Sequence, residues 1–323
     1  MKLPVIDLHC DTATVVLGDR GRAEEPLYRR KGHIDLERGK MLDGYAQFFA
    51  MFTTPHMGKS RPEDIFRWGT ANLLREIEEN ADIFALARSA EEIKQTVADG
   101  KIAAVLSIEG TAGIGYDPEK LEMLRQTGFL MTTLTWNEKN PLAGSHLTGG
   151  GLTDLGREFV MEAGRAGILI DVSHLSDEAF WDIMKITEKP VSASHSNSRA
   201  VCPVSRNLTD DMFRAICETG GVAGLNEYTE FLGNAATLDT ACDHIFHFAE
   251  LDPDCRHIAL GGDWDGCESV PAGVRGLQDY PRLARRLLER GMTEKEVQNI
   301  FWNNALGVIG YAVPDNTKYT GCV

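Results

Sequence analysis

Short apolar runs alternate with helix-like segments along nearly the whole chain. Eight runs have the length and composition of buried strands: residues 5–9, 46–52, 102–108, 129–134, 168–172, 191–194, 222–225 and 258–260. Segments such as 62–80 and 155–166 between them place apolar residues at helical spacing, and Thr153 and Asp154 precede the second as helix-starting residues. This alternation of strands and helices predicts an α/β fold with a parallel sheet.

Eight strand-helix units favour closure into a (β/α)₈ barrel, although an open doubly wound sheet has the same periodicity. A barrel needs about 250 residues, and the 323 residues here leave room for extra C-terminal helices. We therefore expect one domain over residues 1–323, a TIM barrel of the metal-dependent hydrolase type. No internal repeat or linker divides the chain.

Residue types that bind metals follow the ends of several predicted strands. They are His9, Asp11, Glu109, His174, His195 and Asp263. The carboxyl ends of barrel strands meet at one face, where barrel enzymes assemble their active sites. The sequence therefore predicts that these scattered residues converge, and this placement favours the barrel over the open sheet.

His9 and Asp11 are two residues apart, so in an extended strand both point to the same side and Cys10 points away. Glu109 ends a strand that reads as buried on both faces, where a carboxylate needs a partner. A pair of metal ions would supply one, because a carboxylate can bridge two cations. The alternative is an ion pair with an Arg or Lys.

Two histidines, His174 and His195, end consecutive predicted strands, and neutral imidazole is a common zinc ligand. Either alone could be a hydrogen-bonded core residue. The other histidines (His33, His56, His146, His244, His247 and His257) lack this placement and receive no metal role, and His244 and His247 read as one face of a helix.

The last predicted strand leads into Gly261-Gly262-Asp263-Trp264-Asp265-Gly266. The glycines allow a sharp turn close to a ligand. Asp263 is the candidate proton carrier between a metal-bound water and a leaving group, or else a carboxylate that orients a ligand histidine. Asp265 reads as a turn residue.

These motifs together resemble the membrane dipeptidase family (renal dipeptidase, peptidase family M19) of the amidohydrolase superfamily. The resemblance rests on five segments: Ile6 to Asp11, Ser107 to Gly110, Asp171 to His174, Ser194 to Ser196 and Gly261 to Gly266. The resemblance implies two Zn²⁺ ions, with His9 and Asp11 on one, His174 and His195 on the other, and Glu109 as the bridge. It also implies that Asp263 is the proton shuttle and that Arg206 anchors a substrate carboxylate.

The expected activity is therefore zinc-dependent hydrolysis of small dipeptides by a metal-bridging hydroxide, including dipeptides with a D-residue at the carboxyl side. Trp136 stands where mammalian members carry a substrate-binding His, and Phe231 where they carry a Tyr, so substrate preference does not transfer. Alternatives are an amidohydrolase acting on a lactone, a cyclic amide or a deamination substrate, and a barrel that binds a metal or ligand without catalysis.

The net charge and the composition indicate which kinds of binding partner and which cellular location to expect. A net charge of −15 argues against nucleic acid, and no apolar run has the roughly 18 residues of a membrane span. The seven cysteines form no CxxC pair, and the first predicted strand begins at residue 5, which leaves no room for a signal peptide. We therefore expect a cytoplasmic protein with reduced thiols. The family resemblance also suggests a homodimer.

Overall fold

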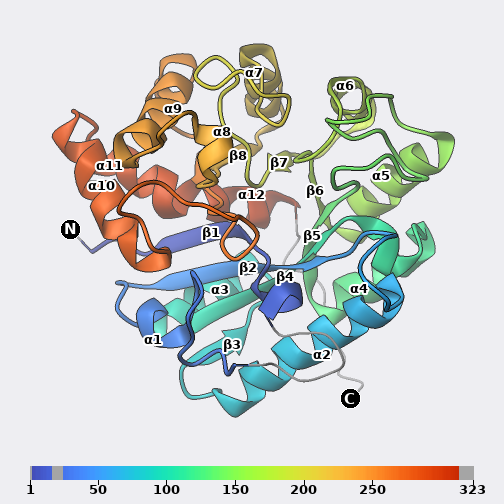
Figure 1. Cartoon of the computed structure of the whole chain (residues 1–323), viewed down its shortest axis with the longest axis horizontal. Helices are drawn as coiled ribbons and strands as arrows, with labels where there is room; N and C mark the ends of the chain where they lie inside the picture. Colours follow the sequence, from blue (N-terminus) through green and yellow to red (C-terminus); the bar gives the residue numbers. More distant parts are fainter. Residues whose placement is uncertain (1, 17–24, 313–323) are drawn as a thin grey trace.

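A computed structural model describes residues 2–16 and 25–312 of the chain as a closed barrel surrounded by helices (Figure 1). Every strand pairing is parallel, in the order β2-β1-β9-β8-β7-β6-β5-β4, and β2 pairs with β4 to close the ring. The strands are β1 (Val5–Cys10), β2 (Tyr45–Phe52), β3 (Phe84–Leu86), β4 (Ile102–Glu109), β5 (Phe129–Thr133), β6 (Leu169–Asp171), β7 (Val191–Ala193), β8 (Val222–Leu225) and β9 (Ile258–Leu260). The predicted (β/α)₈ barrel is confirmed.

All eight predicted strands exist, with ends that differ by at most one residue, but the sequence analysis missed β3. This three-residue strand pairs with the first residues of β4. Since β2 occupies one edge of β4 along 103–109, β3 and β5 share the other edge, β3 at its start and β5 at its end. β3 is therefore an addition to the barrel wall and not a ninth member of the ring.

Helices cover the outside of the barrel (Figure 1). They are α1 (Leu36–Gly39), α2 (Pro62–Glu79), α3 (Ala90–Ala98), α4 (Leu121–Thr127), α5 (Asp154–Ala166), α6 (Asp177–Ile186), α7 (Asp210–Thr219), α8 (Thr229–Leu232), α9 (Leu238–Leu251), α10 (Tyr280–Glu289), α11 (Glu294–Gln298) and α12 (Asn304–Ala312). The Thr153 side chain accepts a hydrogen bond from Gly156 N and begins α5 as predicted. The extra C-terminal helices are α10 to α12.

The C-terminal helix α12 contributes to the inside of the barrel. Its Val308 and Ile309 belong to one buried cluster with residues from strands all around the ring, such as Ile6, Phe48 and Val222. Only inward-facing side chains can meet in this way, and most come from the starts of their strands. α12 therefore packs at the amino-terminal end of the barrel and leaves the carboxyl end open.

A β-bulge turns His9 into the barrel. Asp7 pairs with Gln47 and Cys10 pairs with Phe49, so β1 has one more residue than β2 over this stretch. In a regular strand Asp7 and His9 would share a face, but Asp7 contacts Tyr280 of α10, outside the ring, and His9 points to Glu109 inside it. His9 and Asp11 share a side and Cys10 faces away from them, in agreement with the expected alternation, and the bulge makes that shared side the inside of the ring.

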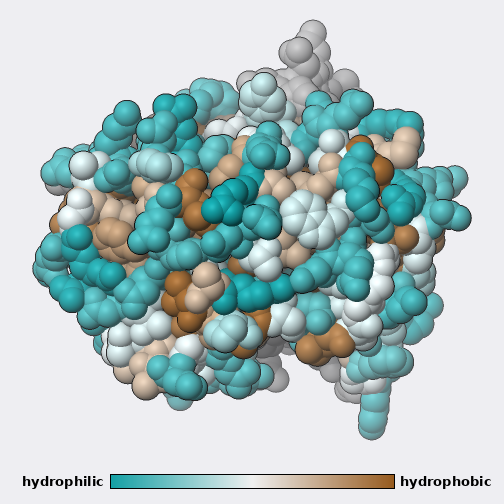
Figure 2. All heavy atoms as spheres, turned by 90° about the horizontal axis from the view of Figure 1, so that it is seen from above, coloured by the Kyte–Doolittle hydropathy of each residue, from teal (hydrophilic) through white to brown (hydrophobic). Residues whose placement is uncertain are grey.

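The face of the molecule seen in Figure 2 is mostly hydrophilic, with small separated hydrophobic patches. Within residues 2–16 and 25–312, no helix has both the length and the apolar character needed to cross a membrane. The six cysteines in this part of the chain are free thiols, and Cys322 lies outside the described residues.

Gly224 of β8 is a point where adjacent strands approach too closely for a side chain. A Cβ at this position would collide with the carbonyl oxygen of Ser194, which is backbone and cannot rotate away. We expect Gly224→Ala to lower the free energy of unfolding by about 3 kcal/mol, as overpacking does in a dense core. Urea unfolding followed by circular dichroism measures the change.

The control is Gly307→Ala in α12, where a Cβ meets nothing within 4 Å. Because alanine favours a helix, this variant should gain up to about 1 kcal/mol. Equal stability of the Gly224→Ala variant and the wild type would mean that the strands can separate at this point.

Candidate metal centre

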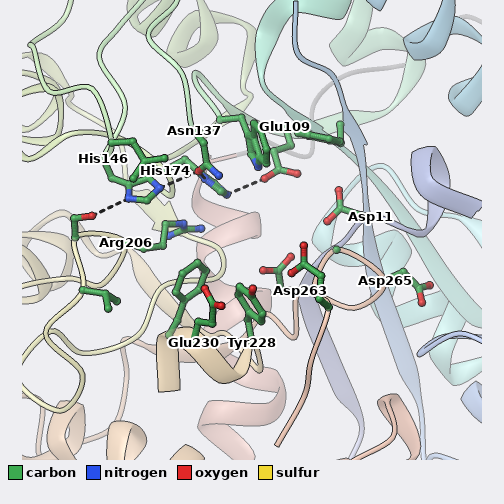
Figure 3. A pocket seen from close by; sticks show the side chains of 18 residues that line it. Asp11, Glu109, Asn137, His146, His174, Arg206, Tyr228, Glu230, Asp263 and Asp265 are labelled. Atoms are coloured by element: carbon green, nitrogen blue, oxygen red, sulfur yellow. Dashed lines mark hydrogen bonds and ion pairs between the residues drawn. The ribbon is translucent and has the colours of Figure 1, made fainter. Parts of the chain in front are cut away.

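The five predicted ligands converge at the open end of the barrel, and Figure 3 shows three of them, Asp11, Glu109 and His174, around one cavity. His9 Nε2 lies 3.3 Å from Glu109 Oε2 and 3.6 Å from Asp11 Oδ2. On the other side of the carboxylate, Glu109 Oε1 lies 2.9 Å from His174 Nε2 and 3.7 Å from His195 Nε2. All five residues are buried. The structure therefore brings together residues that the sequence spreads over nearly 190 positions.

Glu109 belongs to two overlapping groups of ligand atoms. His9, Asp11 and Glu109 form one group, and Glu109, His174 and His195 form the other, with the ligand atoms of each group within 4.8 Å of one another. Each oxygen of Glu109 faces a different group. This is the geometry that a carboxylate bridging two cations requires.

Asp171 is also near the centre, but hydrogen bonds from the protein already occupy both of its carboxylate oxygens. Its two carboxylate oxygens accept bonds from the hydroxyls of Thr133 and Ser194 and from the backbone N–H groups of Ser173 and Ser194. Because the Ser194 hydroxyl hydrogen goes to Asp171, Ser194 Oγ accepts at 2.6 Å from Nδ1–H of His195. Asp171 therefore fixes the tautomer of His195 and leaves its Nε2 lone pair facing the centre.

Unpartnered polar atoms indicate that the residues fit a metal ion. His9 Nε2 and Asp11 Oδ1 are buried and make no hydrogen bond, although buried polar groups are normally satisfied. Together with the Nε2 lone pair of His195, they form a set of nitrogen and carboxylate donors that zinc and similar cations bind. The cluster has the donor types and the unmet bonding capacity of a metal centre.

The pKa values of the cluster reflect its burial and the close packing of its acids and histidines. Burial raises the pKa of Asp11 to about 7, and the nearby Glu109 adds to the effect. Burial alone would lower the pKa of His9, but the charge and hydrogen bonds of Glu109 and Asp11 raise it well above its ordinary value. Burial, with the charges of neighbouring His9 and Arg206, lowers the pKa of His174 and His195 well below the usual range. A cation bound among these groups would compete with their protons.

Asp263 lies beside this centre and is held by Asn226. Its Oδ1 is 3.9 Å from His9 Nε2, and its Oδ2 accepts a hydrogen bond of 2.9 Å from Asn226 Nδ2. Burial raises its pKa to about 6, so it exchanges a proton near neutral pH. Its backbone has a φ of 56°, and that of His174 a φ of 68°, which are unusual values for non-glycine residues and occur often at functional sites.

A cavity of about 510 Å³ opens over the centre, a size suited to a small molecule. Arg206 lines it and is buried, and its Nη1 donates to Ser196 Oγ at 2.6 Å, while Nε and Nη2 have no partner. Figure 3 shows Arg206 on the side of the cavity opposite Asp11 and Asp263. The guanidinium group thus has free donors for an anionic group of a ligand.

Trp136 and Phe231, which mark departures from the mammalian pattern, also line the cavity. Trp136 packs edge-on against Phe52 with ring centroids 5.1 Å apart. The ring of Phe231 lies 5.7 Å from the Arg206 guanidinium. Both residues therefore border the space in which a ligand would bind.

Sequence reasoning missed several side chains of the site. Asn137 contacts His174, Asn226 contacts Asp263, and Ser194 contacts His195. Ser194 and Asn226 directly follow β7 and β8, and Asn137 lies four residues after β5, but asparagine and serine are not among the metal-binding residue types that the strand-end rule selects. Asp265, which reads as a turn residue in the sequence, also forms a buried ion pair with Arg30, in which Arg30 Nη1 lies 2.6 Å from Asp265 Oδ2.

The histidines that received no metal role lie outside both ligand groups. His244 and His247 lie on α9, as predicted. His146 nevertheless lines the cavity, and burial together with the charge of Arg206 lowers its pKa to about 4. No predicted strand ends next to His146 in the sequence, so the strand-end rule does not select it.

A closed parallel barrel with histidine and carboxylate ligands at its carboxyl end is the architecture of metal-dependent hydrolases. The model of the membrane dipeptidase family (peptidase family M19) matches residues 1–318, and the chain belongs to this family. The resemblance found from the sequence motifs is thereby confirmed.

Individual relatives agree with this assignment. An uncharacterized dipeptidase of Schizosaccharomyces pombe is 33% identical over 232 residues, which cover 70% of this chain and 57% of that protein. Dipeptidase AC, a metallopeptidase of family M19, is similar in structure with a TM-score of 0.84 at 27% identity, covering 97% of this chain and 99% of the other. A metallopeptidase from Rhodobacter sphaeroides, liganded with a phosphinate mimic of the dipeptide L-Ala-D-Ala, has a TM-score of 0.85 at 26% identity, covering 97% and 100%.

Glu227 next to the site carries a buried carboxyl group with an unpartnered Oε2. Burial, and then the charges of Asp7 and Asp279, raise its pKa from 4.5 to about 8. Between these two values the folded protein keeps a proton that the unfolded chain has lost. Stability should therefore fall as the pH rises from about 4.5 towards 8.

We expect Glu227→Gln to remove this pH-dependent loss of stability. At pH 8.5 the variant should be more stable than the wild type by up to about 4 kcal/mol, and at pH 4 the two should be equal. Chemical unfolding at the two pH values measures the difference, with exposed Glu250→Gln as the control for loss of a carboxylate. A difference that does not change with pH would contradict the assignment.

Proposed function

We propose that this protein is a zinc-dependent dipeptidase that hydrolyses the amide bond of small dipeptides. The observation that carries the proposal is the pairing of two features across one cavity. A cluster of metal-ligand residues lies on one side, and Arg206 with two unpartnered nitrogen atoms lies on the other. A dipeptide has the matching parts, an amide bond and a free carboxylate close to it.

In this proposal two Zn²⁺ ions occupy the centre. His9 and Asp11 would hold one ion, His174 and His195 would hold the other, and Glu109 would contribute to both. When bound, the ions would supply a hydroxide at neutral pH and polarise the substrate carbonyl. The choice of zinc rests on the mixture of imidazole and carboxylate donors.

Asp263 moves the proton. Its carboxylate lies next to His9 and faces the cavity, and its raised pKa suits a group that takes up a proton and gives it back. Asp263 accepts the proton of the attacking nucleophile at one carboxylate oxygen and delivers it to the departing amine. Asn226, which donates to Oδ2, keeps the other oxygen, Oδ1, directed at the centre.

Arg206 binds the substrate carboxylate and sets the position of the amide bond. The cavity volume of about 510 Å³ suits a short substrate, and Trp136 and Phe231 line its walls. The Rhodobacter sphaeroides metallopeptidase was liganded with a mimic of L-Ala-D-Ala, which supports including substrates with a D-residue at the carboxyl side. The expectations of one domain, a homodimer and a cytoplasmic location stay predictions.

A panel of L,L and L,D dipeptides tests the activity. Protein reloaded with zinc should hydrolyse at least one of them about a hundredfold faster than protein kept with a chelator, because the metal supplies the nucleophile. Release of free amino acids measures the rate, and metal analysis should give two zinc ions per chain. No turnover above the chelated sample on any dipeptide would reject the proposal.

Two variants separate the chemistry from the anchoring and address the alternative functions. Asp263→Asn should lower kcat by about a hundredfold with zinc retained, as loss of a general acid-base group does. Arg206→Ala should mainly raise KM for dipeptides. Steady-state kinetics with parallel metal analysis measures both.

Each variant has an outcome that favours another function. An unchanged KM in Arg206→Ala would favour a lactone, cyclic amide or deamination substrate. An unchanged kcat in Asp263→Asn would remove this residue from the mechanism, and a wild type that binds zinc but converts no substrate would favour a binding barrel.

A further inference from the structure

A row of hydrogen bonds leads from the candidate ligand His174 to the loop that carries Arg206 (Figure 3). His174 Nδ1 lies 2.9 Å from Asn137 Oδ1, and His146 Nε2 lies 2.8 Å from the same oxygen. His146 Nδ1 lies 3.0 Å from the hydroxyl of Ser205, the residue before Arg206. The amide oxygen of Asn137 is thus within hydrogen-bond distance of two imidazole rings.

The donor and acceptor roles along this row follow by elimination. His174 Nε2 faces Glu109 and His195, so a metal bound there needs the Nε2 lone pair and the hydrogen must sit on Nδ1. Asn137 must then present its oxygen and not its NH₂ group. With the amide turned the other way, the hydrogen would move to Nε2 of His174 and block the metal.

The donor and acceptor nitrogen atoms of His146 follow from the same argument. Since Asn137 Oδ1 only accepts, His146 must donate from Nε2, and its Nδ1 is left to accept the hydroxyl hydrogen of Ser205. In this arrangement His146 gives the Asn137 oxygen a second N–H donor beside that of His174.

The backbone holds the two rings in place. His146 N donates to His174 O at 2.9 Å, and Ser145 forms a β-bridge with Leu175. The Ser145 hydroxyl also donates to the carbonyl oxygen of Asn137 at 2.8 Å. The loop from 137 to 146 is thus fastened to the segment that carries His174.

We infer that Asn137 and His146 are positioning residues that hold His174 in the tautomer and orientation required for metal binding. The inference rests on the proposed role of His174 as a metal ligand. Loss of a hydrogen-bond partner behind a ligand histidine typically weakens metal binding by about 10- to 100-fold. The effect should fall on the ion held by His174 and His195 and spare the ion held by His9 and Asp11.

The test compares Asn137→Leu, which removes the acceptor, with Asn137→Asp, which keeps it. Zn²⁺ is titrated into metal-free protein in competition with a chromophoric chelator. Asn137→Leu should weaken one of the two zinc affinities about tenfold or more and leave the other nearly unchanged, while Asn137→Asp should bind like the wild type. The matched control is Asn303→Leu, at an exposed asparagine in the segment between α11 and α12.

Two further readouts separate positioning from a general structural defect. Thermal unfolding of the metal-free proteins should be similar, because the inferred role is directed at the metal. The visible absorption spectrum of Co²⁺-loaded Asn137→Leu should differ from that of the wild type, since the geometry at one ion changes. Equal zinc affinities in Asn137→Leu and wild type would overturn the inference.

His146→Phe keeps the ring volume and removes both nitrogen atoms, and it keeps the inference testable if Leu at position 137 prevents folding. It should weaken the same zinc affinity, by less than Asn137→Leu. An unchanged affinity in His146→Phe would exclude His146 from the row. A wild type that binds no zinc would instead reject the proposed function, so the two failures are distinguishable.

Discussion

The buried carboxylate of Glu109 is the group around which the site is arranged. It ends a strand with apolar neighbours and is only 2% exposed, so water cannot compensate its charge. Three histidines from three other strand ends surround it. The pKa of His9 is raised and the pKa values of His174 and His195 are lowered, so the positive charge near Glu109 is concentrated at His9 and the other two rings present neutral nitrogen donors. A buried carboxylate among imidazole donors is a combination that metal ions bind.

The shape of the barrel makes such a concentration of ligands possible. Parallel strands end on one face, so a short polar segment after each strand suffices to build a site from distant parts of the sequence. The opposite end is filled by α12, which lets the apolar core stay continuous below the ligands. Glycines such as Gly224 and Gly261 let the backbone of neighbouring strands approach the ligand His195 and its neighbour Ser194.

Strand positions and ligand types could be predicted from the sequence because each has a local signal. Apolar runs marked eight strands, and a histidine or acid after a run marked each ligand. Other features depend on neighbours that no local pattern encodes. The bulge at His9 arises from pairing with β2, and β3 is only three residues long.

The polar residues around the ligands were harder to predict for a related reason. Asn137 and Asn226 are ordinary loop residues until the partner side chain is known. His146 is close to His174 only because its loop pairs with the segment after β6. Glu227 looks like any surface acid next to Tyr228, and only the fold reveals that it is buried.

The place of α12 has a consequence for how the chain is made. Its apolar residues complete a cluster that includes Ile6 and Leu8 from the first strand, so the two ends of the described chain share one core. During synthesis the amino-terminal strand emerges long before this partner exists. The inside of the barrel can therefore close only after α12 has left the ribosome, and contacts of such long range slow the final step of folding.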